Sequence, residues 1–134
     1  MIKTHQRSQV MYSLDIGSPD KNFNSKHPAI ENVAGAVSKL VGGCTVIDSI
    51  GYWADVQKAD RESYNDVAIG QEHNVQLQIK AELHKEKELE KILVGAMVTV
   101  GVMWPELGFN WVCGHKVTAD GLTVAFNFAL DENK

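Results

Sequence analysis

Hydrophobic and polar residues alternate along several short stretches of this chain. Every second residue is apolar between residues 10 and 16, and again between residues 75 and 83. A repeat of two residues is typical of a β-strand that buries one face and leaves the other wet. The turn formers Asp120-Gly121 indicate a hairpin between two later strands. Three further strands are predicted, over residues 44–53, 109–117 and 122–130.

Two other stretches carry apolar residues at helical spacing. Residues 28–41 place them three or four positions apart, begin with Pro28 and are followed by Gly42-Gly43, which are a favourable start and end for a helix. A second helix is predicted from near Lys85 to Trp104, where Pro105 follows. A second apolar stripe on this helix predicts cover on more than one side, and it consists of Val94, Val98 and Val102.

The predicted order is β-α-β-loop-β-α-β-β in one domain of 134 residues. We expect flexible tails at residues 1–8 and 131–134, and a long polar loop over residues 54–73, which is typical of a functional lid or of disorder. Two βαβ-like halves of this size predict an α+β fold, a ferredoxin-like split βαβ sandwich with both helices on one face of the sheet. The final strand would extend that sheet.

The other face of the predicted sheet would carry a mixture of apolar and polar side chains. A face of this kind, left without helices, is expected to be partly buried against other copies of the chain. We therefore predict a homo-oligomer, and a trimer with three sheets facing inward is the usual solution for this architecture. The residues on which this prediction depends are Met11, Ile47, Trp53, Gln76 and Gln78.

Composition narrows the possible functions. The net charge of −4 and the pI near 5.7 argue against a nucleic-acid-binding protein. The longest apolar run, residues 92–104, is too short to span a membrane, and the N-terminus lacks the apolar segment of a signal peptide, so a cytoplasmic protein is expected. Cys44 and Cys113 form no CxxC pair and are predicted to be buried strand residues in a reducing compartment.

Several common catalytic and cofactor motifs are missing from the sequence. It contains no GxxxxGK[ST] or GxGxxG phosphate-binding loop and no GxSxG nucleophile turn. The histidines show no HExxH or similar ligand spacing, so no metal site is predicted.

Chemistry is instead suggested by the end of the second strand. It finishes in Gly51-Tyr52-Trp53 rather than in an Asn-Gly turn, and so delivers a phenol and an indole to the start of the loop. In a split βαβ fold, Tyr52 can meet Glu72, before the third strand, and Glu106, after the second helix, at a subunit boundary. A phenol and two carboxylates suit a cationic ligand with hydroxyl and amino donors, and the indole of Trp53 adds a cation–π surface. Ser49 lies on the same strand face as Trp53 and is a second candidate binding residue.

A structural interpretation stands beside this one for each carboxylate. Glu72 and Glu106 would then be solvated residues at a strand edge or in a loop. Asp48 is also of interest, because it shares a predicted apolar face with Val46 and Ile50.

Several segments between about residues 9 and 117 carry a resemblance to a known family: VMYSLDIGS, the helix that follows His27, VIDSIGYW, EHNVQLQI with the helix that ends in Trp104, and FNWVCGH. The sequence resembles the phage enzymes that degrade S-adenosylmethionine and are now understood as lyases. The resemblance implies a ferredoxin-like fold similar to the nitrogen-regulatory PII proteins, a trimer with S-adenosylmethionine bound between subunits, and no cofactor. It also implies formation of methylthioadenosine and homoserine lactone, in the host cytoplasm if a phage encodes the protein.

The family's site residues map onto Tyr52, Glu72 and Glu106 as the catalytic set. Here Tyr52 directly follows Gly51 and the loop to Glu72 is longer than in better-known members. Trp53 or Tyr64 could therefore occupy the place of the family's tyrosine.

Two other functions remain open from the sequence. A PII-like, non-enzymatic module would bind an adenine nucleotide between subunits and use loop 54–73 for signalling. The nearest candidates for its phosphates are Lys58, Arg61 and Lys80, but acidic residues are as common there, which favours a cationic ligand. A small interaction protein without a pocket, such as a phage inhibitor of a host enzyme, is the third possibility.

Overall fold

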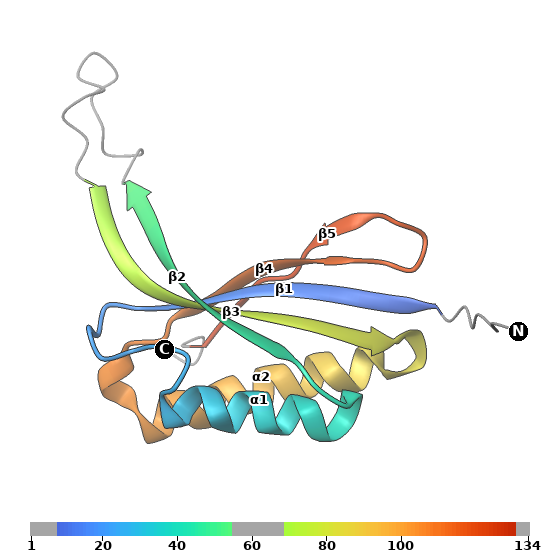
Figure 1. Ribbon diagram of the computed structural model, residues 1–134, viewed down its shortest axis with the longest axis horizontal. Coiled ribbons are helices and arrows are strands. Elements are labelled where there is room, and N and C mark those ends of the chain that lie inside the picture. The colour runs from blue at the N-terminus through green and yellow to red at the C-terminus, as the bar shows by residue number, and fades with distance from the viewer. Residues whose placement is uncertain (1–7, 55–68, 131–134) are drawn as a thin grey trace, which may run out of the picture.

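The computed structural model describes residues 8–54 and 69–130 (Figure 1). The two predicted tails, apart from Ser8, and residues 55–68 of the predicted loop lie outside the described residues. Within the described part, the elements in chain order are β1 (Gln9–Ser18), α1 (Pro28–Val41), β2 (Thr45–Ala54), β3 (Ile69–Glu82), η2 (Leu83–Lys85), α2 (Glu86–Met103), η3 (Pro105–Leu107), β4 (Trp111–Val117), β5 (Thr123–Ala125) and β6 (Phe128–Ala129).

The strands form one antiparallel sheet in the order β2-β3-β1-β4-β5, and β6 also pairs with β4. Because β3 pairs antiparallel with both β1 and β2, those two strands run parallel to each other with β3 between them. This is the split βαβ arrangement, so the predicted ferredoxin-like α+β fold is confirmed.

Both helices lie on the same side of the sheet, as Figure 1 shows. The alternation in β1 and β3 explains this, because Val10, Leu14, Leu77 and Ile79 all point to that side and are fully buried. Leu93 of α2 joins the same core. The second stripe of α2, by contrast, is exposed in the single chain at Val94, Val98 and Val102.

Helix α1 has the ends that the sequence predicts. His27 is the N-cap residue, and its Nδ1 accepts a hydrogen bond from the backbone N–H of Ala29 at 3.0 Å. Pro28 opens the first turn, and Gly42 ends the helix in the left-handed conformation with a φ of 97°. These caps fix where the chain leaves the helix and enters β2.

The hairpin of β2 and β3 is longer than predicted. Residues 69–73, placed in the loop by the sequence, belong to β3, and β2 runs to Ala54. The sequence gives no alternation there because the hairpin curves away beyond the helices (Figure 1), so neither of its faces is buried in the single chain.

The predicted C-terminal strand, residues 122–130, is divided into β5 and β6. Its ladder with β4 is interrupted where the Oδ1 of Asn127 accepts a hydrogen bond from the backbone N–H of Gly114 at 2.9 Å. Phe126 N–H still donates to the carbonyl of Gly114. The segment therefore follows β4 and extends the sheet, as expected.

Candidate ligand site on the open face of the sheet

The face of the sheet opposite the helices is called the open face here. It carries a row of polar side chains: Gln76 Nε2 donates to Asp15 Oδ1 at 3.3 Å, and Gln78 Nε2 donates to Gln76 Oε1 at 3.1 Å. Large apolar side chains also lie exposed on this face, at Met11, Ile47, Trp53 and Trp111. The predicted mixture of polar and apolar residues is therefore present.

A hollow of about 520 Å³ lies on the open face where the β2–β3 hairpin leaves the body of the molecule. Its floor comes from the central strands β1 and β3, and its sides come from β2, β4 and the segment before β4. The described residues that line this acidic hollow are Asp15, Gly17, Trp53, Glu72, Asn74, Gly108, Asn110, Trp111 and Cys113.

Glycines in the neighbouring strands make room for the polar side chains of β3. A Cβ atom at Gly17 would collide with Glu72 Oε1 and would lie 2.7 Å from Asn74 Oδ1. A Cβ at Gly51 would collide with Asn74 Nδ2. Neither glycine has a positive φ, so space rather than backbone conformation requires glycine at these two positions.

The indole of Trp53 is placed in the same way. Trp53 pairs with Gly70 across the hairpin, and a Cβ on Gly70 would collide with the indole ring. The ring therefore lies across β3 instead of standing upright from β2. The Gly51-Tyr52-Trp53 sequence thus serves two purposes, because Gly51 admits the amide of Asn74 and Trp53 forms one side of the hollow.

The hollow is acidic. Asp15 and Glu72 contribute carboxylates, and the described residues that line it include no Lys, Arg or His. Within the described part of the chain, the carboxylate of Glu72 has no hydrogen bond or ion pair. Asn74 Oδ1 is shielded from solvent and has no hydrogen-bond partner there either. The described lining of the hollow therefore offers carboxylates without a cationic side chain to balance them.

The predicted site residues are only partly brought together. Trp53 and Glu72 both line the acidic hollow. Ser49 lies beside it, paired with Asn74 across the hairpin, and its Oγ is 3.5 Å from the carbonyl oxygen of Asn74. Tyr64 lies outside the described residues.

Tyr52 and Glu106 do not line the acidic hollow of the single chain. Tyr52 points to the opposite face of β2, is exposed, and accepts a hydrogen bond from Gln71 Nε2 at 3.3 Å. Glu106 is exposed in η3. Their predicted convergence with Glu72 at a subunit boundary stays a prediction.

Asp48 has a structural explanation. It accepts hydrogen bonds from the backbone N–H and the Oγ of Ser25, both at 2.6 Å. These bonds, first that from the hydroxyl, hold the pKa of Asp48 below its ordinary value. The carboxylate therefore ties β2 to the segment that leads into α1, which explains a charge on this face of the strand.

Sequence reasoning missed Asp15, Asn74 and Trp111, which line the acidic hollow from β1, β3 and β4. The prediction that both cysteines are buried is wrong for Cys113, which is exposed, and Cys44 is only partly buried. Cys113 neighbours the buried Val112 in β4, so it must point to the open face.

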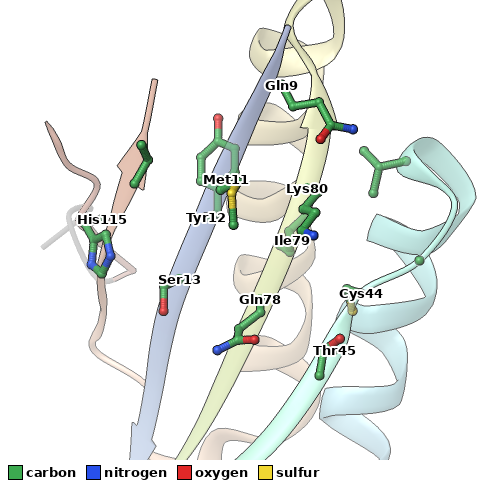
Figure 2. Close-up of a pocket in the computed structure, with 13 residues that line it drawn as sticks. Gln9, Met11, Tyr12, Ser13, Cys44, Thr45, Gln78, Ile79, Lys80 and His115 are labelled. Atoms are coloured by element: carbon green, nitrogen blue, oxygen red, sulfur yellow. The ribbon is translucent and has the colours of Figure 1, made fainter. Parts of the chain in front are cut away.

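A second hollow, of about 710 Å³, lies at the other end of the open face (Figure 2). Figure 2 shows Ser13 of β1, Gln78 and Lys80 of β3 and His115 of β4 around it. None of the predicted site residues lines this hollow. Lys80, considered above for phosphate binding, therefore lies apart from Trp53 and Glu72.

The described residues contain neither a membrane-spanning helix nor a cluster of metal ligands. No helix among them is both long and apolar enough to cross a membrane. No three His, Cys, Asp or Glu residues among them are grouped as metal ligands.

Comparison with known proteins finds solved structures that resemble this chain but no curated protein that matches it in sequence. No protein-family model and no curated protein matches the chain. A solved phage SAM lyase in complex with S-methyl-5'-thioadenosine is similar with a TM-score of 0.59 and 10% identity, over 100% of this chain and 99% of that chain. A phage SAM lyase in the apo state is similar with a TM-score of 0.60 and 7% identity, over 98% of each chain. The resemblance noted in the sequence is thus confirmed at the level of fold, and the described part of the chain has the fold of the phage SAM lyases.

Proposed function

We propose that this protein is a lyase that degrades S-adenosylmethionine. The observation that carries the proposal is that Trp53 and Glu72, both predicted from the sequence to contact a cationic substrate, line one acidic hollow. S-Adenosylmethionine carries a sulfonium and an ammonium group, and both suit carboxylates and an indole face. The shared fold with phage SAM lyases supports the same reaction class.

The reaction is internal to the substrate. One oxygen of its carboxylate forms a bond to the γ-carbon, and the bond from that carbon to sulfur breaks. The bonding electron pair goes to sulfur, which changes from a sulfonium to a neutral thioether, and the products are methylthioadenosine and homoserine lactone. Atoms and charges balance without water, metal or an external base.

Catalysis then depends on the conformation of the bound substrate. Holding the carboxylate in line with the carbon–sulfur bond can lower the barrier by up to roughly 7–11 kcal/mol. A protein carboxylate beside the sulfonium would stabilise the substrate more than the transition state, because the positive charge disappears during the reaction. Glu72 is therefore expected to hold the ammonium group or the ribose hydroxyls, while Tyr52 orients the substrate carboxylate.

We also propose that the chain acts as a homotrimer with its ligand between subunits. The exposed Met11, Ile47 and Trp111 on the open face support this, since the helices cover only the other side. Tyr52 and Glu106 would then reach the acidic hollow of a neighbouring copy. Ile47→Lys should dissociate the oligomer in light-scattering chromatography, whereas Val102→Lys, on the outer side of α2, should leave its mass unchanged.

The test of the function is product analysis. The purified protein is incubated with S-adenosylmethionine and the products are followed by liquid chromatography and mass spectrometry. Methylthioadenosine with homoserine lactone is expected, and Glu72→Gln should lower kcat/KM by about 10- to 100-fold, because a charge-assisted contact is lost. Glu88→Gln, an exposed carboxylate on α2, is the matched control and should keep full activity. Absence of both products from the wild-type protein would overturn the proposal.

The alternative, a PII-like module for an adenine nucleotide, finds less support in the acidic hollow. Phosphates need cations or several backbone donors, and the described lining residues offer two carboxylates and no Lys or Arg. Tight binding of ATP or ADP without turnover would favour that module over the lyase.

A further inference from the structure

Asn74 has a polar atom that the folded chain leaves without a partner. Its Oδ1 is shielded from solvent but accepts no hydrogen bond within the described part of the chain. A buried acceptor without a donor costs about 1–3 kcal/mol. Two glycines, Gly17 and Gly51, leave the space that this costly side chain occupies.

The position of this atom is informative. Asn74 Oδ1 and Glu72 Oε1 both lie against the same point above Gly17, so the two acceptors are neighbours. Asp15, on the same strand as Gly17, adds a third acceptor group to the hollow. Glu72 and Asn74 both line the hollow, and the carboxylate of Glu72 is carried on a side chain with three rotatable bonds. A ligand that enters there meets two carboxylates and the amide of Asn74.

We propose that Asn74 is a substrate-binding residue whose Oδ1 accepts a hydrogen bond from the α-ammonium group of the substrate, together with Glu72. This assignment rests on the proposed function, since it names the part of S-adenosylmethionine that this end of the hollow receives. An ammonium group has three donors and no acceptor. It therefore satisfies a set made of two carboxylates and one amide oxygen, and it is charge-complementary to the carboxylates.

A different role for Asn74 would follow if its side-chain amide were flipped by about 180° about χ2, a torsion with a broad distribution. Nδ2 would then face Glu72 and donate to it, and Asn74 would position Glu72 without meeting the ligand. The two roles predict opposite results for Asn74→Asp. Asp keeps an acceptor for the ammonium group, but it has no donor for Glu72 and repels it.

The experiment measures binding of two unreactive probes by calorimetry. S-Adenosylhomocysteine keeps the α-ammonium group of the substrate but has a neutral thioether in place of the sulfonium. Methylthioadenosine lacks the amino-acid part altogether. Asn74→Leu should weaken S-adenosylhomocysteine binding by about 10- to 100-fold, as for a lost bond to a charged group, and should leave methylthioadenosine binding unchanged. Asn74→Asp should bind S-adenosylhomocysteine within a few-fold of the wild type.

Thermal unfolding of the ligand-free variants tests whether a loss of binding comes from a loss of folding. Asn74→Leu should unfold at the wild-type temperature or above it, because an unsatisfied buried acceptor is replaced by an apolar group of similar size. Gln78→Leu, on the same face of β3 but outside the acidic hollow, is the matched control and should bind both probes as the wild type does.

Three results would overturn the proposal. Equal weakening of both probes in Asn74→Leu would place Asn74 at the nucleoside. Loss of S-adenosylhomocysteine binding in both variants would make Asn74 a positioning residue for Glu72. A wild-type chain that binds neither probe would remove the ammonium site altogether. Because these assays detect binding, a failure of turnover alone would overturn the lyase function and not the assignment of Asn74.

Discussion

The carboxylate of Glu72 lies over the backbone of Gly17, in the space that a Cβ atom would fill. The two residues lie on adjacent strands, β3 and β1, at the floor of the acidic hollow. The position of the Glu72 carboxylate therefore depends on the absence of a side chain at Gly17.

Gly17→Ala is expected to lower substrate affinity without unfolding the protein. The added methyl group collides with the ends of Glu72 and Asn74, which are side-chain atoms that can move. The backbone at Gly17 is one that alanine can adopt. We expect about a 10-fold loss in affinity for S-adenosylhomocysteine, in line with a displaced charge-assisted contact, measured by calorimetry. Gly35→Ala, a helical glycine with open space around it, is the control and should bind normally.

A cluster of charges under α2 should contribute to stability. Lys116 Nζ lies 2.7 Å from Glu90 Oε2 and 3.1 Å from Glu86 Oε2, and these side chains are mostly buried. Lys116→Met should lower the free energy of unfolding by about 1–2 kcal/mol, between the values for exposed and for fully buried pairs. Urea unfolding at neutral pH measures this loss. Lys91→Met, an exposed lysine of α2, should change stability by less than about 0.5 kcal/mol.

The same cluster predicts a loss of stability in alkali. Burial, and then the hydrogen bond that its hydroxyl donates to Glu90 at 2.5 Å, hold the pKa of Tyr12 well above its ordinary value. The hydrogen bond to Glu90 also raises the pKa of Lys116. Groups with raised pKa values stabilise the fold fully below their unfolded pKa values, about 10 for Tyr and 10.4 for Lys, and lose that contribution as the pH rises further.

Unfolding measured from pH 8 to pH 11 should therefore show a decline that begins near pH 10. Tyr12→Phe removes one of the two groups responsible, so its decline should be shallower than that of the wild type. An identical pH dependence in the two proteins would contradict the role given to Tyr12. The substitution also removes one hydrogen bond to a carboxylate, which should cost about 1–2 kcal/mol at neutral pH.

Ser25 and Asp48 provide a prediction about a single pKa. Ser25→Ala removes the hydroxyl that donates to Asp48 and leaves the backbone N–H in place. The pKa of the Asp48 carboxyl should rise towards its ordinary value of about 3.9, in a titration followed by NMR. In the wild type the lowered pKa means that this contact stabilises the fold above that value and is lost in acid. An unchanged pKa in Ser25→Ala would show that the hydroxyl does not bind Asp48.

The helices and the buried parts of the strands can be predicted from the sequence, because burial of one face produces the apolar periodicity that marks them. Helix α1 begins and ends where Pro28 and Gly42 place it, and the buried halves of β1 and β3 alternate clearly. The start of β3 could not be predicted in this way. Around Gly70, both faces of the hairpin are exposed in the single chain, so no apolar period marks it as a strand.

The candidate site was predictable only in part for a related reason. Trp53 and Glu72 attract notice by residue type, and the acidic hollow contains both. Asn74 looks like any polar residue on a wet strand face. Its importance appears only when register is known, because register places it opposite Gly17 on one side and diagonal to Gly51 on the other. Contacts between strands depend on register, which the alternation of a single strand does not contain.

The packing of Trp53 over Gly70 gives the last prediction. Gly70→Ala places a methyl group where the indole ring lies, and the backbone there accepts alanine, so the strand should form while the ring is pushed away. Acrylamide should then quench tryptophan fluorescence more strongly, and S-adenosylmethionine should bind more weakly because the indole no longer forms the side of the hollow. In a Trp53→Ala background, where no ring remains to displace, Gly70→Ala should weaken binding no further. An equal effect of Gly70→Ala in both backgrounds would mean that the methyl group acts on the backbone of β3, and that Trp53 has no part in forming the site.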